Sequence, residues 1–198
     1  MLLPNLHILG IQGSGKGTQV AELVKQYGFT PISTGELFRQ RAKVEDAYGQ
    51  YVKRHLEEGE LLTAEDLTQI LENYLQTTPI ATGILGDGVL RTVEQWGKLA
   101  TLWPQYKLGE PMLIFLNLSE EVARERIAKR HGLEGRTDDL PKATERRLQL
   151  FHEKTMPVVE LFQSHGRCVT IDASQEVATV TSEITKAIHS FFPEFASK

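Results

Sequence analysis

The segment from Gly10 to Thr18 has the residue types and spacing of a phosphate-binding loop. It reads Gly-Ile-Gln-Gly-Ser-Gly-Lys-Gly-Thr and stands between an apolar run and a helical pattern. In such a loop, glycines let backbone N–H groups converge on phosphate oxygens, and the following helix adds the positive end of its dipole. Lys16 would reach the outer phosphates. The residues predicted to contact phosphate are Gly13, Ser14, Gly15, Lys16, Gly17 and Thr18.

One position of this loop departs from the strict motif. The residue after the lysine is Gly17, where the motif has Ser or Thr to bind Mg²⁺, and the hydroxyl comes one place later at Thr18. We therefore expect the loop to hold Mg²⁺ less directly. Asp87 ends an apolar run, at the kind of strand end where α/β proteins form ligand sites, and we expect it to hold the magnesium water shell.

Arginines form a second group suited to phosphate chemistry, because a planar guanidinium binds phosphate oxygens at two points. Arg126 and Arg130 are four residues apart and so share one face of a predicted helix. Spacing alone leaves a solvated basic stripe as the alternative for this pair. The window 124–147 holds eight basic and five acidic residues, a balance of +3 in a chain of net charge −4. This concentration favours a compact polyanion as the ligand.

Composition excludes several other classes of protein. The 198 residues are 40% hydrophobic and 24% charged, as in ordinary globular chains. The net negative charge argues against non-specific binding to nucleic acid or to an anionic membrane. A single cysteine, Cys168, excludes an intramolecular disulfide and a multi-cysteine zinc site. No apolar run approaches the roughly 20 residues that span a bilayer, so we expect a soluble, cytoplasmic monomer.

The elements that must position these residues follow from the hydrophobic pattern. Short apolar runs alternate with longer segments of helical period, which predicts a parallel sheet with helices on both faces. The predicted strands are 6–11, a short one near Pro31, 83–87, 112–117 and 168–172. The predicted helices are 18–26, 35–43, 48–58, 64–76, 93–101, 120–130, 143–162 and 176–192. The fold class is therefore α/β, with a five-stranded parallel sheet in a three-layer sandwich.

Local signals refine the helix ends. Ser33 and Glu36 have the spacing of a capping box at the start of the second helix. Pro157 should kink the seventh helix or end it early. The polar segment 131–140 contains two glycines between two helices, so we predict a loop or lid there.

An ordered series of motifs resembles the adenylate kinases and their nucleoside monophosphate kinase relatives. Its members are Gly-Lys-Gly-Thr-Gln at 15–19, Ser-Thr-Gly-Glu-Leu-Phe-Arg at 33–39, Gly-Glu-Leu-Leu at 59–62, Asp-Gly-Val-Leu-Arg-Thr at 87–92 with Gln95, Arg-Ile-Ala-Lys-Arg at 126–130, Gly-Arg-Thr-Asp-Asp at 135–139 and Arg-Arg-Leu at 146–148. The series spans nearly the whole chain. Only five residues separate Arg130 from Arg136, which resembles the short-lid form of the family.

The resemblance implies reversible transfer of the terminal phosphate of MgATP to AMP, which gives two ADP. It also implies a P-loop core made of residues 1–32, 63–129 and 140–198, an inserted helical segment at 33–62 that binds the monophosphate, and a short lid at 130–139. Mg²⁺ would enter with ATP. Long lids of the family carry a zinc site, but this lid has neither the length nor the cysteines, so we expect no zinc.

The family's roles carry over onto matching positions. The implied ATP-binding residues are Gly13, Ser14, Gly15, Lys16, Gly17, Thr18, Arg126, Arg130 and Gln175. The implied AMP-binding residues are Thr34, Arg39, Glu60, Leu61, Leu62, Gly88, Val89, Leu90, Arg91, Gln95, Arg136 and Arg147. The implied catalytic residues are Lys16, Arg91, Arg130, Arg136 and Arg147. Arg124 and Arg146 match no such role, and we expect them to be surface residues.

Three functions remain open at this stage. Thr34 and Thr92 favour AMP over the pyrimidine monophosphates, because uridylate and cytidylate kinases of the family tend to carry Ala and Asn there. A kinase of another monophosphate and a non-catalytic adenine-nucleotide sensor are the alternatives. Departures at Gln12, Gly86 and Leu90 keep the sensor open. Leu90 replaces a family proline, and we predict a trans peptide bond before it because cis is costly before other residues.

Overall fold

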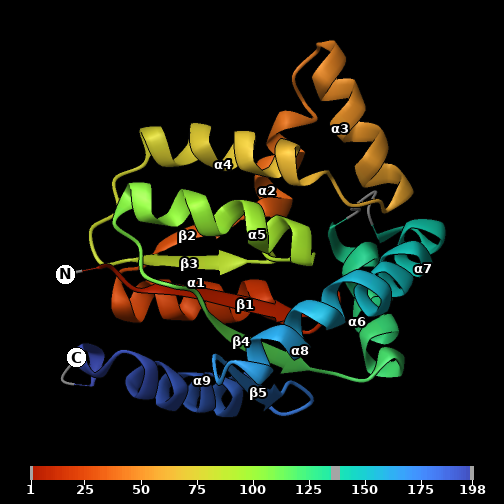
Figure 1. Ribbon diagram of the computed structural model, residues 1–198. Coiled ribbons are helices and arrows are strands. Elements are labelled where there is room, and N and C mark those ends of the chain that lie inside the picture. The colour runs from red at the N-terminus through yellow and green to blue at the C-terminus, as the bar shows by residue number, and fades with distance from the viewer. Residues whose placement is uncertain (1, 135–138, 197–198) are drawn as a thin grey trace.

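The computed structural model describes residues 2–134 and 139–196 (Figure 1). Its strands are β1 (Asn5–Gly10), β2 (Thr30–Ser33), β3 (Ile84–Asp87), β4 (Met112–Asn117) and β5 (Cys168–Asp172). Its α-helices are α1 (Lys16–Tyr27), α2 (Thr34–Arg41), α3 (Ala47–Glu58), α4 (Ala64–Thr77), α5 (Val93–Leu102), α6 (Glu120–Glu134), α7 (Pro141–Leu150), α8 (Met156–Ser164) and α9 (Val177–Phe191). Short 3-10 helices lie at Trp103–Tyr106 and Pro193–Phe195.

The five strands form one parallel sheet in the order β2-β3-β1-β4-β5, which confirms the predicted fold class. Strand β1 lies between β3 and β4, and Ile8 stands opposite Asp87 in the register. The strands β2 and β3 are added next to one edge of β1, and β4 and β5 are added next to its other edge. Such a switch in direction opens a crevice at the carboxyl ends of the strands, where α/β proteins bind ligands.

Helices cover both faces of the sheet and bury its apolar side chains. One hydrophobic cluster joins Leu6 and Ile8 of β1 to Leu23 of α1 and Ile184 of α9. A second cluster on the other face joins sheet residues to α4, α5 and α8 around the buried Trp103. Figure 1 shows α4 and α5 above the sheet and α9 below it. Because the central strands β1 and β4 are buried on both faces, they appear in the sequence as short, mostly apolar runs.

Helices α2 and α3 follow β2, and α3 stands out from the sheet and the helices that cover it (Figure 1). The capping box predicted at the start of α2 is wrong. The Ser33 side chain makes no cap hydrogen bond, and Glu36 instead accepts hydrogen bonds from Arg39 at 3.1 and 3.3 Å. The guanidinium three residues away is a stronger partner for that carboxylate than a backbone N–H. A capping box does form at α4, between Thr63 and Asp66.

The long helix predicted at 143–162 is divided into α7 and α8 by a π-helical turn, Phe151–Thr155. Pro157 stands in the first turn of α8, where its missing N–H costs little. The predicted disturbance therefore takes the form of a π turn before the proline. Helix α6 also continues to Glu134, four residues beyond its predicted end, so the first part of the predicted 131–140 loop is helical.

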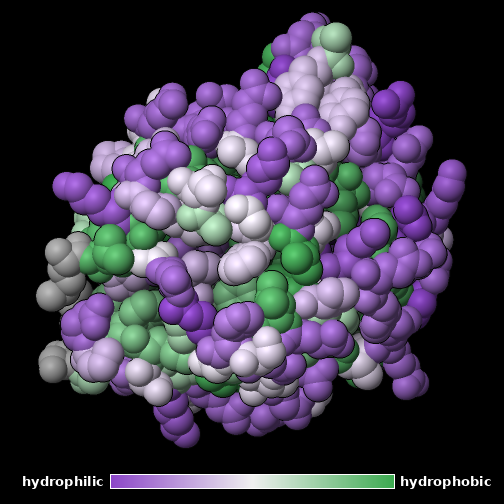
Figure 2. All heavy atoms as spheres, viewed as in Figure 1, coloured by the Kyte–Doolittle hydropathy of each residue, from purple (hydrophilic) through white to green (hydrophobic). Residues whose placement is uncertain are grey.

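On the face shown in Figure 2, hydrophilic residues predominate and hydrophobic ones are scattered or in small groups. Among the residues that the structure describes, no helix combines the length and apolar character needed to cross a bilayer.

Candidate active site

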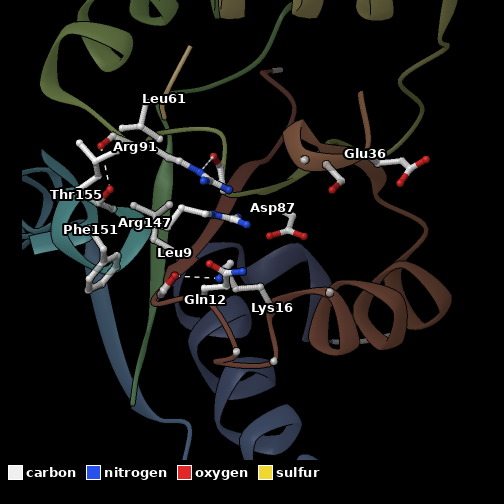
Figure 3. A pocket seen from close by; sticks show the side chains of 18 of the residues that line it. Leu9, Gln12, Lys16, Glu36, Leu61, Asp87, Arg91, Arg147, Phe151 and Thr155 are labelled. Carbon is white, nitrogen blue, oxygen red and sulfur yellow. Dashed lines mark hydrogen bonds between the residues drawn. The ribbon is translucent and has the colours of Figure 1, made fainter. Parts of the chain in front are cut away.

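A cavity of about 400 Å³ lies at the carboxyl ends of β1 and β3. The phosphate loop forms its floor, and α2, the turn after β3, α7 and the π turn contribute the rest of its lining (Figure 3). Six charged residues of the predicted site line this one cavity: Lys16, Arg39, Asp87, Arg91, Arg130 and Arg147. The predicted convergence of these residues is therefore observed.

The phosphate loop takes the conformation that its glycines allow. Gly13 and Gly15 have φ of 84° and 88°, in the left-handed region that residues with a Cβ avoid, and Gly15 caps the start of α1. A Cβ at Gly10 would lie 2.7 Å from the carbonyl oxygen of Leu116, so β1 and β4 approach too closely there for any other residue. Helix α1 consequently begins at Lys16 with its N-terminus facing the cavity.

Lys16 lies folded over its own loop. Its Nζ donates hydrogen bonds to the carbonyl oxygens of Gly10 at 2.8 Å and of Ile11 at 3.0 Å. Burial lowers the pKa of Lys16 to about 7, with Asp87 opposing the shift and Arg91 among the groups that add to it. A phosphate anion in the cavity would reverse that balance, because it favours the charged amine.

Arg91 and Arg147 point into the cavity toward Asp87 (Figure 3). The Nε of Arg91 donates to the carbonyl of Gly88 at 2.9 Å, and its own carbonyl accepts from the Thr155 hydroxyl at 3.0 Å. Thr155 belongs to the π turn, so that turn helps to fix the arginine. Two guanidinium groups beside a lysine can neutralise phosphate oxygens from both nucleotides.

Arg130 is held by a carboxylate and, through it, by the phosphate loop. Its guanidinium makes a two-point contact with Asp139 at 2.6 and 2.7 Å, and Gln12 donates to the same carboxylate at 2.6 Å. Burial alone would raise the pKa of Asp139, but the bonds from Arg130 and Gln12 keep it below its ordinary value. This carboxylate positions Arg130 beside the loop.

A pocket beside the cavity is lined by most of the residues assigned to the acceptor base. It holds only about 30 Å³, and Thr34, Gln95 and the backbone of 59–62 are among its walls. The Thr34 hydroxyl donates to the carbonyl of Gly88 at 3.1 Å. The Gln95 amide donates to the carbonyl of Leu62 at 3.2 Å and accepts from the Arg91 N–H at 3.0 Å. A base would have to widen this pocket and exchange some of these bonds.

A third pocket, of about 280 Å³, lies on the other side of the phosphate loop. Arg126 and Gln175 line it together with loop residues, as the donor-nucleotide assignment requires. The Nη1 of Arg126 donates to the carbonyl of Ala173 at 3.1 Å. This bond fixes one end of the Arg126 guanidinium at the wall of the pocket.

Three predicted site residues, Leu90, Arg39 and Arg136, differ from the others in their surroundings or lie outside the described residues. Leu90 is fully buried in the core and lines none of these pockets, although the bond before it is trans as predicted. Arg39 lines the main cavity but also contacts Glu36. Arg136 lies outside the described residues.

Sequence reasoning missed Gln12, Asp139 and Thr155 as positioning groups. Asp139 stands within the quoted lid motif, and its place in a basic window was the available signal. Thr155 carried no such signal, because only the π turn brings it to Arg91.

The oxygen atoms available as metal ligands in the cavity suit a magnesium ion that arrives with a nucleotide. Mg²⁺ keeps several waters and takes one or two carboxylates together with substrate phosphates. The Asp87 carboxylate and the Thr18 residue both line the main cavity. No group of three His, Cys, Asp or Glu side chains that could hold a metal occurs within residues 2–134 and 139–196. When bound, the ion would neutralise charge on the phosphates, with Asp87 as its protein contact.

Comparisons with known proteins identify the family of this chain. The family model for adenylate kinase matches residues 8–167. An adenylate kinase of Parabacteroides distasonis is 30% identical over 93% of this chain and 97% of its own length. One from Xanthomonas campestris is 34% identical over 92% and 98%. A UMP-CMP kinase of Mus musculus is 32% identical over 90% and 93%. Together, the phosphate loop, the cavity arginines and these matches show that the chain belongs to the adenylate kinase family.

Proposed function

We propose that the protein transfers the terminal phosphate of MgATP to AMP, reversibly, and so forms two ADP. The observation that carries this proposal is the continuity of the three pockets. The pocket lined by Arg126 and Gln175, here called the donor-side pocket, shares Arg130 and loop glycines with the main cavity. The small pocket lined by Thr34 and Gln95, here called the acceptor pocket, shares Arg91 and Arg147 with it. Two nucleotides can therefore meet with their phosphates in one cationic space.

The proposed chemistry needs alignment and charge neutralisation rather than a general base. The phosphate of AMP is already largely ionised near neutral pH, so its oxygen can attack without losing a proton. Lys16, Arg91, Arg130 and Arg147 surround the space in which charge would spread over the transferred group. Arg136 completes the proposed set, and residues 33–62 and 130–139 are the proposed monophosphate segment and lid.

The acceptor pocket supports a base that carries an amino group. Because the Thr34 hydroxyl already donates its hydrogen to Gly88, its free lone pairs can only accept. AMP, CMP and GMP carry an amino group that can donate to Thr34, whereas UMP offers only its ring N3–H. Thr92 accepts from the N–H of Gln95 at 3.0 Å and thereby fixes the second base-facing residue at the start of α5. The similarity to the mouse UMP-CMP kinase makes a pyrimidine monophosphate kinase the second candidate.

A coupled assay with MgATP and each of AMP, UMP, CMP and GMP tests the proposal. We expect the highest kcat/KM with AMP. Faster transfer to UMP or CMP would favour the second candidate. Nucleotide binding without transfer to any of the four would leave an adenine-nucleotide sensor.

A further inference from the structure

An ion pair outside the main cavity joins the acceptor pocket to α7. The Nε of Arg146 donates to Oε1 of Glu60 at 2.6 Å, and its Nη2 donates to Oε2 at 3.2 Å. The two residues are 86 positions apart, and each side chain is 35% exposed. A two-point contact of this kind fixes direction as well as distance. Arg146, which we expected at the surface, is half-buried and bonded to Glu60.

Glu60 begins the strip of backbone, residues 60–62, that walls the acceptor pocket. Gly59, just before it, ends α3 with a φ of 74°, and a Cβ there would lie 2.5 Å from the carbonyl oxygen of Ala143. The chain thus runs directly against α7 at this point. Glu60 lines the pocket, and its carboxylate bonds Arg146, the neighbour of the cavity residue Arg147.

The other end of this strip, at Leu62, is held by a hydrogen bond. Leu62 accepts its hydrogen bond from Gln95, the residue that faces the base position. Because the pocket holds only about 30 Å³, an entering base must widen it and compete for the Gln95 amide. Arg146 is not among the residues that line this pocket, so its bond to Glu60 can persist through that exchange.

We propose that Glu60 and Arg146 are positioning residues, whose ion pair holds the acceptor wall against α7 while the monophosphate binds. The pair keeps residues 60–62, which face the base, at a fixed position relative to Arg147, which faces the phosphate. The contact between this strip and α7 therefore holds both the base and the phosphate of one acceptor. This inference rests on the proposed function only in taking a nucleoside monophosphate as the acceptor.

A double-mutant cycle tests the pairing. In Glu60→Gln, in Arg146→Gln and in the double variant, we expect the KM for AMP to rise about two- to fivefold, as loss of one partly exposed ion pair implies. The KM for ATP and the melting temperature should stay near those of the parent. The KM for AMP of the double variant should be no higher than that of the more affected single variant. A variant with the two charges exchanged, Glu60→Arg with Arg146→Glu, should have a KM for AMP closer to that of the parent.

Arg124→Gln is the matched control, because Arg124 also bonds two glutamates, Glu120 and Glu145, but touches no wall of the acceptor pocket. Its KM for AMP should match the parent. Glu60→Gln is the cleaner single change, since it leaves the bond between Arg146 and Gln149 in place.

Hydrogen exchange of the unliganded proteins gives a readout that does not depend on catalysis. Amides of residues 59–62 should exchange faster in Glu60→Gln than in the parent and in Arg124→Gln. Unchanged exchange, additive effects in the cycle, or equal rises in the KM for AMP and for ATP would overturn the proposal. If the parent transfers phosphate to no monophosphate, the proposed function fails, and the exchange data alone then decide whether the pair holds this strip.

Discussion

Lys16 is the residue on which the proposed chemistry depends most directly. Its amine sits over the loop, contributes no apolar packing and faces the space for the transferred phosphate. We expect Lys16→Met to lower kcat about 100-fold or more, since a single lost donor to transition-state charge has effects of that order. The melting temperature should stay close to that of the parent. Lys25→Met, an exposed lysine in the last turn of the same helix, is the control and should keep full activity.

The depressed pKa of Lys16 also predicts proton uptake when nucleotide binds. At pH 7.5 an amine of pKa about 7 is mostly neutral, and the negative phosphates would raise its pKa and charge it. Binding of MgATP should then take up roughly 0.7 proton at this residue. Calorimetry in two buffers of different ionisation enthalpy measures the uptake. Equal uptake by the parent and by Lys16→Met would show that Lys16 is already charged in the free protein.

At the scale of elements, the strands were easier to predict than the contacts between helices. Burial makes a central strand such as β4 a nearly continuous apolar run, so the predicted 112–117 coincides with it, and the predicted 168–172 coincides with β5. Helix ends depend on local competition for polar groups. Glu36 illustrates this, because Arg39 and not the backbone binds it.

Most of the cavity residues were also predictable, because each stands in a motif with a fixed local context. Pairs such as Glu60–Arg146 and Gln12–Asp139 were not. They join segments 86 and 127 residues apart, and no local pattern marks them. The π turn that brings Thr155 to Arg91 has no sequence signature either, apart from the proline that follows it.

The turn between β3 and α5 gives a prediction at this scale. Gly88 and Arg91 line the acceptor pocket, whereas Leu90 between them is buried and follows a trans peptide bond. Proline at this position would lower the trans preference from about 2.5–4 to about 0.5–1 kcal/mol and would remove the packed leucine side chain. We expect Leu90→Pro to change the KM for AMP severalfold and the KM for ATP less.

Steady-state kinetics with each substrate varied in turn measure the two constants for Leu90→Pro. Leu90→Met, which keeps the volume and the ordinary peptide preference, is the matched control. An unchanged KM for AMP in the proline variant would mean that this turn tolerates either residue.

At the scale of the whole molecule, β1 connects the site to the core. Its carboxyl end leads into the phosphate loop, while its middle carries His7, which is fully buried against the second hydrophobic cluster. The Nε2 of His7 bonds Asn5 at 2.7 Å, and its ring occupies the space beside Gly86, where a Cβ would lie 2.2 Å from Nδ1. Gly86 therefore makes room for a polar ring at the centre of the sheet.

This buried ring predicts that acid destabilises the whole fold. Burial lowers the pKa of His7 from 6.5 to about 3, so only the unfolded chain binds a proton at this residue between those values. Stability from His7 is complete above about pH 6.5 and is lost as the pH falls toward 3. At pH 5 the loss should be roughly 2 kcal/mol, since one unit of pKa corresponds to about 1.4 kcal/mol.

Urea unfolding of the parent and of His7→Gln at pH 7.5, 6 and 5 measures this contribution. The parent should lose stability more steeply with falling pH than His7→Gln, whatever the stability of the variant at pH 7.5. His165→Gln, which removes an exposed imidazole, controls for the loss of one titratable ring. Parallel pH profiles for the parent and His7→Gln would show that the ring is protonated within the fold, and that the sheet accommodates the charge beside Gly86.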